Sequence, residues 1–268
     1  MEIGISTATY FGKELTEDTF KLINGMKIPI CEVFLTTFSE YTPEFCDLLL
    51  ERKGEVEVYS VHTLNQQFEP ELFNNVPRTR QNAERFFIEA GVTAGKLGAK
   101  YYTFHGPSRI KPRPYNHNYP LIGARLNELD ALLMSVGNGC RLTYETVHWA
   151  HFANPDFFEN VKKYCDTFAC LDIKQVMQSN IELEMYIKAI GDRLKNVHLC
   201  DYDSSGRLYA PGQGEFDFTT FFKRLYDIGY DGPMMMELYS GDYKDYGEIE
   251  RSYEYLKNCL EIAKRSNI

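Results

Sequence analysis

Short runs of apolar and β-branched residues alternate with longer amphipathic stretches along the whole chain. Eight such runs are typical of strands, and several, such as Val56–Val61, are apolar enough to be covered on at least one face. The predicted strands are Glu2–Ser6, Cys31–Leu35, Val56–Val61, Tyr101–Phe104, Arg141–Tyr144, Phe168–Leu171, Asn196–Leu199 and Met234–Met236. Because helix signals separate each run from the next, the pattern predicts parallel strands joined by helical crossovers.

Capping residues and apolar stripes predict the helices between these strands. Apolar side chains recur at steps of three and four over residues 83–97 and 249–263, which is the spacing of one helix face. Gly98 follows the first stripe and is typical of a left-handed helix end. The residues expected to cap helices are Thr42 before Pro43, Asn154 before Pro155, Ser179 with Glu182 as a capping box, and Asp217, whose helix should end at Gly229.

Eight alternating strand and helix units in 268 residues favour one closed barrel over two separate domains. We therefore predict an α/β fold, a (β/α)8 TIM barrel, formed by residues 1–268 as a single domain. An open, doubly wound sheet is the alternative, because closure cannot be read from a sequence. The Gly-x-Gly-x-x-Gly fingerprint of dinucleotide-binding sheets does not follow the first strand.

Composition narrows the class of protein. Lys and Arg total 29 against 38 Asp and Glu, a net charge of −9, which argues against a dedicated nucleic-acid binder. No run approaches the ~18 apolar residues of a membrane span. The start at residues 1–4 lacks the features of a secretory signal, and the seven cysteines are scattered without a Cys-x-x-Cys pair. These features predict a cytoplasmic protein with reduced thiols.

The most informative pattern is the chemistry at the strand ends. Five of the eight predicted strands are directly followed by a histidine or an acidic residue, and a sixth contains a histidine next to its last residue. In a barrel the carboxyl ends of all strands converge on one mouth, so side chains far apart in sequence meet there. These residues are His62, His105, Glu145, Asp172, His198 and Glu237. Gathering three carboxylates without a cation would be costly, so the pattern predicts a divalent metal site.

Five further segments have a distinctive order and spacing. They are Tyr-Glu-Thr-Val-His-Trp at 144–149, Leu-Asp-Ile-Lys-Gln at 171–175, Asn-Val-His-Leu-Cys-Asp at 196–201, Pro-Gly-Gln-Gly-Glu-Phe-Asp-Phe at 211–218, and Gly-Tyr-Asp-Gly-Pro before Met-Met-Met-Glu at 234–237. With these segments the chain resembles, over essentially its whole length, the xylose isomerase-like TIM barrels. That family groups sugar isomerases and epimerases with the apurinic endonuclease IV enzymes (AP endonuclease family 2).

The resemblance implies a set of metal ligands. The four residues that match the metal site of the epimerase branch are Glu145, Asp172, His198 and Glu237. Three carboxylates and one imidazole suit Mn²⁺, Mg²⁺ or Co²⁺ at least as well as Zn²⁺. His62 and His105 match two histidines that help the counterpart of Glu145 hold a further zinc in the endonuclease branch. Here they either join such a second metal site, bind substrate hydroxyls beside a single metal, or are structural.

The chain departs from the family pattern twice. Asp172-Ile173-Lys174-Gln175 stands where Asp-x-x-His is common. Arg207-Leu208-Tyr209 stands where the nuclease supplies an Asp-x-His ligand pair before the Pro-Gly turn. The three-zinc nuclease site is therefore incomplete.

The predicted ligands also suggest a reaction. A keto sugar, sugar phosphate or cyclitol bound to the metal through its carbonyl would lose the neighbouring C–H proton to form an enediolate. Glu145 and Glu237, on different strands, are the predicted acid/base pair. Return of a proton to the opposite face gives epimerisation, and return to the neighbouring carbon gives isomerisation. Loss of a hydroxyl gives an inosose-type dehydration, and the sequence does not choose among the three.

Four more residues are candidates for substrate binding. Lys174 and Gln175 either contact substrate or orient Asp172. Arg109 lies in a basic, proline-rich loop that either holds a substrate phosphate or carboxylate, or is a solvated surface loop. Trp149 either forms a wall of the pocket, since sugars stack on aromatic faces, or only packs.

Three classes of function follow from these observations. The first is a metal-dependent sugar or cyclitol isomerase, epimerase or dehydratase, whose partner is a small-molecule substrate. The second is an apurinic-site endonuclease with an incomplete zinc site, which the acidic charge disfavours. The third is a catalytically silent barrel used as a binding module. The family resemblance also suggests a homo-oligomer, a dimer or a tetramer.

Overall fold

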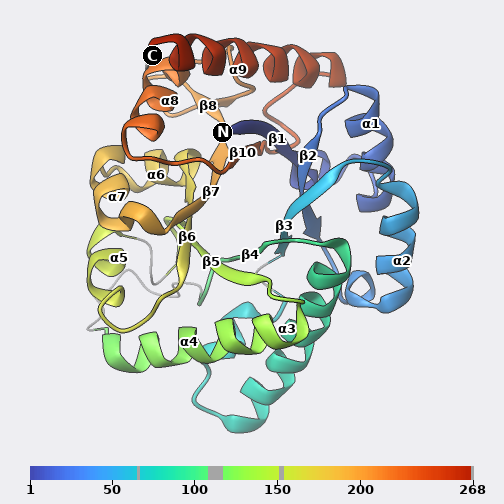
Figure 1. Ribbon diagram of the computed structural model, residues 1–268, viewed down its shortest axis with the longest axis vertical. Coiled ribbons are helices and arrows are strands. Elements are labelled where there is room, and N and C mark those ends of the chain that lie inside the picture. Colours follow the sequence, from blue (N-terminus) through green and yellow to red (C-terminus); the bar gives the residue numbers. More distant parts are fainter. Residues whose placement is uncertain (65–66, 108–116, 151–153, 267–268) are drawn as a thin grey trace.

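The computed structural model describes residues 1–64, 67–107, 117–150 and 154–266. Eight parallel strands form a closed barrel in the order β1-β10-β7-β6-β5-β4-β3-β2, with helices around its outside (Figure 1). These strands are β1 (Glu2–Ser6), β2 (Ile30–Leu35), β3 (Glu57–Thr63), β4 (Tyr101–Phe104), β5 (Arg141–Glu145), β6 (Phe168–Asp172), β7 (Leu194–Leu199) and β10 (Pro233–Met236). The predicted (β/α)8 TIM barrel is confirmed, and each strand lies within two residues of its predicted ends.

Helices follow the strands as the apolar stripes predict. They are α1 (Thr19–Gly25), α2 (Pro43–Arg52), α3 (Pro77–Leu97), α4 (Tyr119–Val136), α5 (Pro155–Val161), α6 (Ile173–Ser179), α7 (Leu183–Ile190), α8 (Phe218–Asp227) and α9 (Tyr246–Ser266). Three predicted caps are confirmed by side-chain oxygens that accept backbone N–H groups: Thr42 from Phe45, Asn154 from Phe157 and Asp217 from Thr220. Gly98 ends α3 with φ of 79°, as expected. No helix in the described residues is long and apolar enough to cross a membrane.

The predicted capping box at residues 179–182 is wrong. Ser179 is the last residue of α6, and its hydroxyl donates to the carbonyl of Val176. Glu182 precedes α7 without a side-chain capping bond. The reason lies upstream, where the Asp172 side chain accepts the backbone N–H of Gln175 and starts α6 directly at the end of β6.

Several short elements were not predicted. An antiparallel pair, β8 (Asp201–Tyr202) and β9 (Leu208–Tyr209), extends the loop after β7. The single-turn 3₁₀ helices are η1 (Thr7–Tyr10), η2 (Thr16–Asp18), η3 (Phe38–Tyr41), η4 (Glu69–Phe73) and η5 (Gly191–Arg193). Such short pieces carry too few residues for a periodic apolar pattern, so only the structure reveals them.

Two β-bulges interrupt the barrel on opposite sides. Between β2 and β3 the register shifts so that Tyr59 has no partner, and between β6 and β7 the same is true of Lys195. The Tyr59 hydroxyl donates to the Lys195 carbonyl at 2.6 Å, so the two bulges meet across the barrel. Ser60 and Asn196, the next residue on each strand, then begin the layer of side chains that forms the site.

The Asp217 cap gives a first test of the fold. Asp217→Ala is expected to lower the free energy of unfolding by about 1 kcal/mol, because the first turn of α8 loses its side-chain acceptor. Urea denaturation followed by circular dichroism measures the change. Asp217→Asn keeps a capping oxygen and should stay close to wild type, so an equal loss in both variants would contradict the capping role.

Candidate functional site

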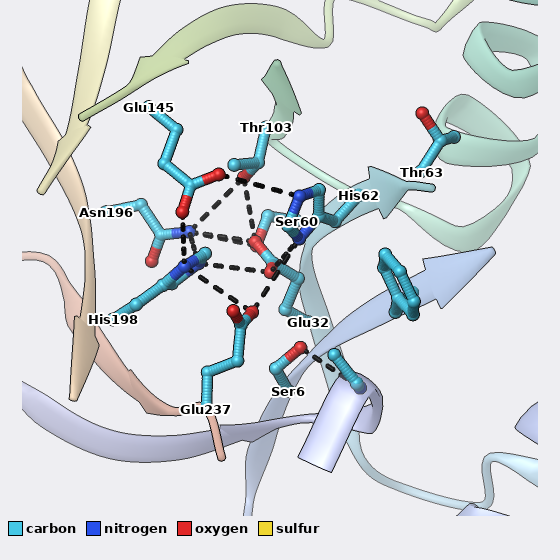
Figure 2. A network of polar contacts seen from close by, with 12 residues as sticks. Ser6, Glu32, Ser60, His62, Thr63, Thr103, Glu145, Asn196, His198 and Glu237 are labelled. Atoms are coloured by element: carbon cyan, nitrogen blue, oxygen red, sulfur yellow. Dashed lines mark hydrogen bonds and ion pairs between the residues drawn. The ribbon is translucent and has the colours of Figure 1, made fainter. Parts of the chain in front are cut away.

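The six predicted strand-end residues meet at one mouth of the barrel, and all six are buried. His62, Glu145, Asp172 and His198 lie on β3, β5, β6 and β7, while His105 and Glu237 directly follow β4 and β10. Figure 2 shows His62, Glu145, His198 and Glu237 pointing toward one another from different strands. The convergence predicted from the sequence is therefore present in the structure.

One group contains the four predicted metal ligands. One ligand atom from each of Glu145, Asp172, His198 and Glu237 lies within 4.8 Å of the others. His198 Nδ1 faces all three carboxylates, at 3.4 Å from Glu145 Oε1, 3.4 Å from Glu237 Oε2 and 3.8 Å from Asp172 Oδ2. Within the described residues, each of the four also has a buried atom without a hydrogen-bond partner: Glu145 Oε2, Asp172 Oδ2, His198 Nδ1 and Glu237 Oε2. This donor set fits a divalent cation.

A second group shares Glu145 with the first. The Nε2 atoms of His62 and His105 lie 2.7 Å apart, and Glu145 Oε2 is 3.6 Å from the first and 3.3 Å from the second. These three ligand atoms also lie within 4.8 Å of one another. Two imidazoles and one carboxylate form a donor set richer in nitrogen than the first group, which suits zinc.

The sequence analysis missed Glu32, which lies between these two groups. Its side chain projects from β2 into the barrel and is fully buried. Its Oε1 atom is 3.2 Å from His62 Nδ1 and 3.1 Å from His198 Nε2. Figure 2 shows Glu32 beside both rings. The available signal was a single acidic residue inside the otherwise apolar run Cys31–Leu35.

Glu69 was also missed, and it supports His105. It is fully buried on η4, and its Oε2 atom lies 3.0 Å from both the backbone nitrogen and Nδ1 of His105. Its Oε1 atom accepts hydrogen bonds from the Thr63 and Tyr102 hydroxyls. No sequence pattern marks Glu69, because it lies in an irregular segment between β3 and α3.

The charges in the site stabilise one another. Burial alone would raise the pKa of Glu237, yet the His198 imidazole and the Lys174 ammonium hold that pKa well below its usual range. The Asp172 pKa is likewise lowered, against the effect of burial, by Lys174 and His198. Burial alone would lower the pKa of His62, but the neighbouring carboxylates of Glu237 and Glu32 raise it to about 10. These carboxylates are therefore ionised at neutral pH.

The remaining predicted residues lie around this centre, except Arg109, which is outside the described residues. The Lys174 ammonium is buried, 3.5 Å from Glu237 Oε1, 3.6 Å from Asp172 Oδ2 and 4.2 Å from the Tyr239 ring centroid. Gln175 donates its backbone N–H to Asp172 Oδ1, and its side-chain oxygen lies 2.6 Å from His148 Nδ1. The Trp149 ring is half-buried with its centroid 5.5 Å from that of His105.

A cavity lies beside the ends of β1 and β2, and none of the six candidate ligands lines it. Its volume is about 360 Å³, and its lining includes Thr7, Phe11, Lys13 and Phe34. The Phe34 ring packs edge-on against His62, with centroids 5.2 Å apart. This cavity therefore reaches the side chains that flank the second group of ligands.

Comparison with known proteins assigns this chain to a family. The sequence profile described as Xylose isomerase-like TIM barrel matches residues 23–264. Among solved structures, D-psicose 3-epimerase with D-tagatose from Clostridium cellulolyticum H10 is 16% identical, with a TM-score of 0.76 over 97% of this chain and 99% of that one. A D-tagatose 3-epimerase-like protein is 18% identical, with a TM-score of 0.78 over 100% of both chains.

A third similar structure is 3-keto-D-glucoside 4-epimerase from E. coli, which is 17% identical with a TM-score of 0.73 over 97% of this chain and 100% of that one. Among curated protein sequences, none matches this chain. At these identities, the similar structures establish only the fold. The sequence profile covers residues 23–264, which is most of the chain, and it therefore establishes the family. The chain thus belongs to the xylose isomerase-like TIM barrel family.

Proposed function

We propose that this protein is a metal-dependent epimerase or isomerase that acts on a keto sugar, sugar phosphate or cyclitol. The observation that carries the proposal is the convergence of one ligand atom from each of Glu145, Asp172, His198 and Glu237 within 4.8 Å, at residues that each keep a buried atom without a hydrogen-bond partner among the described residues. The similar structures are ketose 3-epimerases and a 3-keto-D-glucoside 4-epimerase, which supports sugar chemistry at such a site.

The four residues would hold Mn²⁺, Mg²⁺ or Co²⁺, with Zn²⁺ as a further candidate. Such an ion, when bound, supplies a Lewis acid for the carbonyl of the substrate. Glu145 and Glu237 belong to strands that β6 and β7 separate in the barrel, so their carboxylates approach His198 from different sides. One of them takes the C–H proton next to the carbonyl, and the other returns a proton from the opposite side. Both are buried, so the proton passes directly between the carbon and a carboxylate, and the carboxylate exchanges its own proton with solvent between turnovers.

We also propose a second cation at His62, His105 and Glu145. The outer ring nitrogens face carboxylates, since His62 Nδ1 is next to Glu32 and His105 Nδ1 is next to Glu69. These carboxylates keep a proton on each outer nitrogen, so the inner Nε2 atoms, 2.7 Å apart, share a single proton when no cation is bound. Both Nε2 atoms and Glu145 could bind a cation in place of that proton, which supports this interpretation over substrate binding or a purely structural role.

Hydrogen exchange and metal analysis test the proposal. Protein purified without chelators should contain divalent metal, and it should replace a C–H proton next to the carbonyl of a ketose or an inosose with deuterium in D₂O. Proton NMR measures that exchange. Removal of the metal with EDTA should abolish the exchange, and Mn²⁺ should restore it, because an unassisted carboxylate is too weak a base for this proton.

The controls separate the alternatives. An abasic DNA duplex is incubated with the same metal-loaded protein, and chelation-sensitive incision would favour the endonuclease instead. Absence of both metal and exchange over a broad panel of ketoses, ketose phosphates and inososes would contradict the proposed function.

A further inference from the structure

Glu32 contacts one histidine from each group of candidate ligands. We infer that Glu32 is a positioning residue that fixes the ring orientation and the N–H position of His62 and His198 together, and so couples the two cation sites. The inference rests on the proposed function, in which both histidines bind cations. It concerns a residue that makes no contact with substrate in this proposal.

The Glu32 carboxylate is itself held firmly. Its Oε2 atom accepts hydrogen bonds from Ser60 Oγ at 2.7 Å, Thr103 Oγ1 at 2.8 Å and Asn196 Nδ2 at 2.9 Å. These donors come from β3, β4 and β7, so the carboxylate is anchored to three strands (Figure 2). Among the described residues, no group donates a hydrogen bond to its Oε1 atom, which faces the two imidazole rings.

The two rings face Glu32 through different nitrogens. His198 directs Nε2 to Glu32 and Nδ1 to Glu145 and Glu237. His62 directs Nδ1 to Glu32, with Glu237 Oε2 farther away at 3.7 Å, and directs Nε2 to Glu145 and His105. Glu32 is the carboxylate nearest to either ring, at 3.2 Å from His62 Nδ1 and 3.1 Å from His198 Nε2, so these nitrogens keep their protons and the other nitrogen of each ring is left to bind a cation. Glu32 thus sets the N–H on Nδ1 of His62 and on Nε2 of His198.

This arrangement distinguishes Glu32 from Glu69. Glu69 contacts the ring of one candidate ligand, His105, among the residues that the structure describes. Loss of Glu32 should therefore weaken both cation sites at once, whereas loss of Glu69 should weaken only the site that contains His105. Outer carboxylates of this kind are worth about 10–100-fold in metal affinity.

Imidazole N–H signals give the first test, and they do not depend on activity. In ¹⁵N-labelled wild type we expect slowly exchanging protons on Nδ1 of His62 and Nε2 of His198, both metal-free and loaded with Zn²⁺, because the outer nitrogen keeps its proton in either state. His62→Asn and His198→Asn assign the signals. In Glu32→Gln both protons should exchange faster or disappear. A wild-type spectrum with the protons on the opposite nitrogens would overturn the inference without any Glu32 variant.

Zinc titration gives the second test. By calorimetry, Glu32→Gln should weaken both binding steps by about 10–100-fold, and Glu69→Gln should weaken one. Glu32→Asp keeps the charge and should recover part of the loss. Glu248→Gln is the matched control, because Glu248 is a buried carboxylate that accepts the backbone N–H of Lys244 away from the site.

The outcomes remain distinguishable from those of the proposed function. Two unchanged zinc steps together with unchanged N–H signals in Glu32→Gln would overturn the role of Glu32, whatever the substrate is. If Glu32→Gln does not fold, the wild-type spectrum and Glu32→Asp still decide. Failure of every sugar to exchange deuterium would contradict the proposed reaction and leave the N–H and zinc measurements intact.

Discussion

The Glu145→Gln variant is expected to lose deuterium exchange by about 10³-fold or more while it keeps its fold. Glutamine has the shape of glutamate but is neither a base nor an anionic ligand. Glu145 Oε1 faces His198, and Glu145 Oε2 faces His62 and His105, so the carboxylate belongs to both candidate cation sites. The variant should therefore also lose metal from both sites.

Glu237→Gln separates the chemistry from the second site. It should lose exchange to a similar extent, but it retains the group of His62, His105 and Glu145 and should keep the metal bound there. Elemental analysis and proton NMR in D₂O measure the two effects on the same samples. Glu254→Gln, an exposed position on α9, is the control. Exchange at the wild-type rate in either site variant would rule out its assignment as acid or base.

Lys174→Met is expected to give the largest loss of stability. The buried ammonium lies between Asp172 and Glu237, and removing one partner of a buried ion pair leaves uncompensated charge. The free energy of unfolding of the metal-free protein should fall by about 3–5 kcal/mol. Without the ammonium, the carboxylates attract a divalent cation more strongly, so added Mn²⁺ should raise the unfolding temperature more in the variant than in wild type.

Thermal and urea unfolding with and without Mn²⁺ measure both effects. Lys188→Met replaces an exposed lysine on α7 and should change the free energy of unfolding by no more than about 0.5 kcal/mol. Equal stability of Lys174→Met and wild type without metal would show that the ammonium does not compensate the carboxylates.

The fold and the inner ligands could be predicted from the sequence for a common physical reason. Parallel strands buried on both faces need short apolar runs, and a barrel directs their carboxyl ends to one mouth. His105 directly follows β4, and Glu237 directly follows β10. Such a polar residue can be recognised in the sequence, and its position at the barrel mouth follows from the fold. The six residues found in this way all meet in the structure, where Glu32 joins them.

The outer carboxylates could not be found by the same reasoning. Glu32 lies inside a strand, where strand alternation alone does not tell whether an acidic side chain faces the barrel interior or a helix. Glu69 reaches His105 from a 3₁₀ turn whose position depends on tertiary packing. The capping-box prediction was wrong for a related reason, because a serine can stand at the start or at the end of a helix. Asp172 caps α6, and this helix then ends at Ser179.

The meeting of Tyr59 and Lys195 has a consequence for how this barrel could be redesigned. Side chains alternate strictly along a regular strand, so one unpaired residue resets which positions point inward from there on. Deletion of Tyr59 or Lys195 would restore an even ladder, in which His62 stays opposite Phe34 and His198 stays opposite Asp172, so both rings would still point into the barrel. The two unpaired residues thus mark the boundary between the buried cluster of Ile30, Tyr59 and Met235 and the ligand-bearing mouth, and a redesign could remove either one without reversing the ligands.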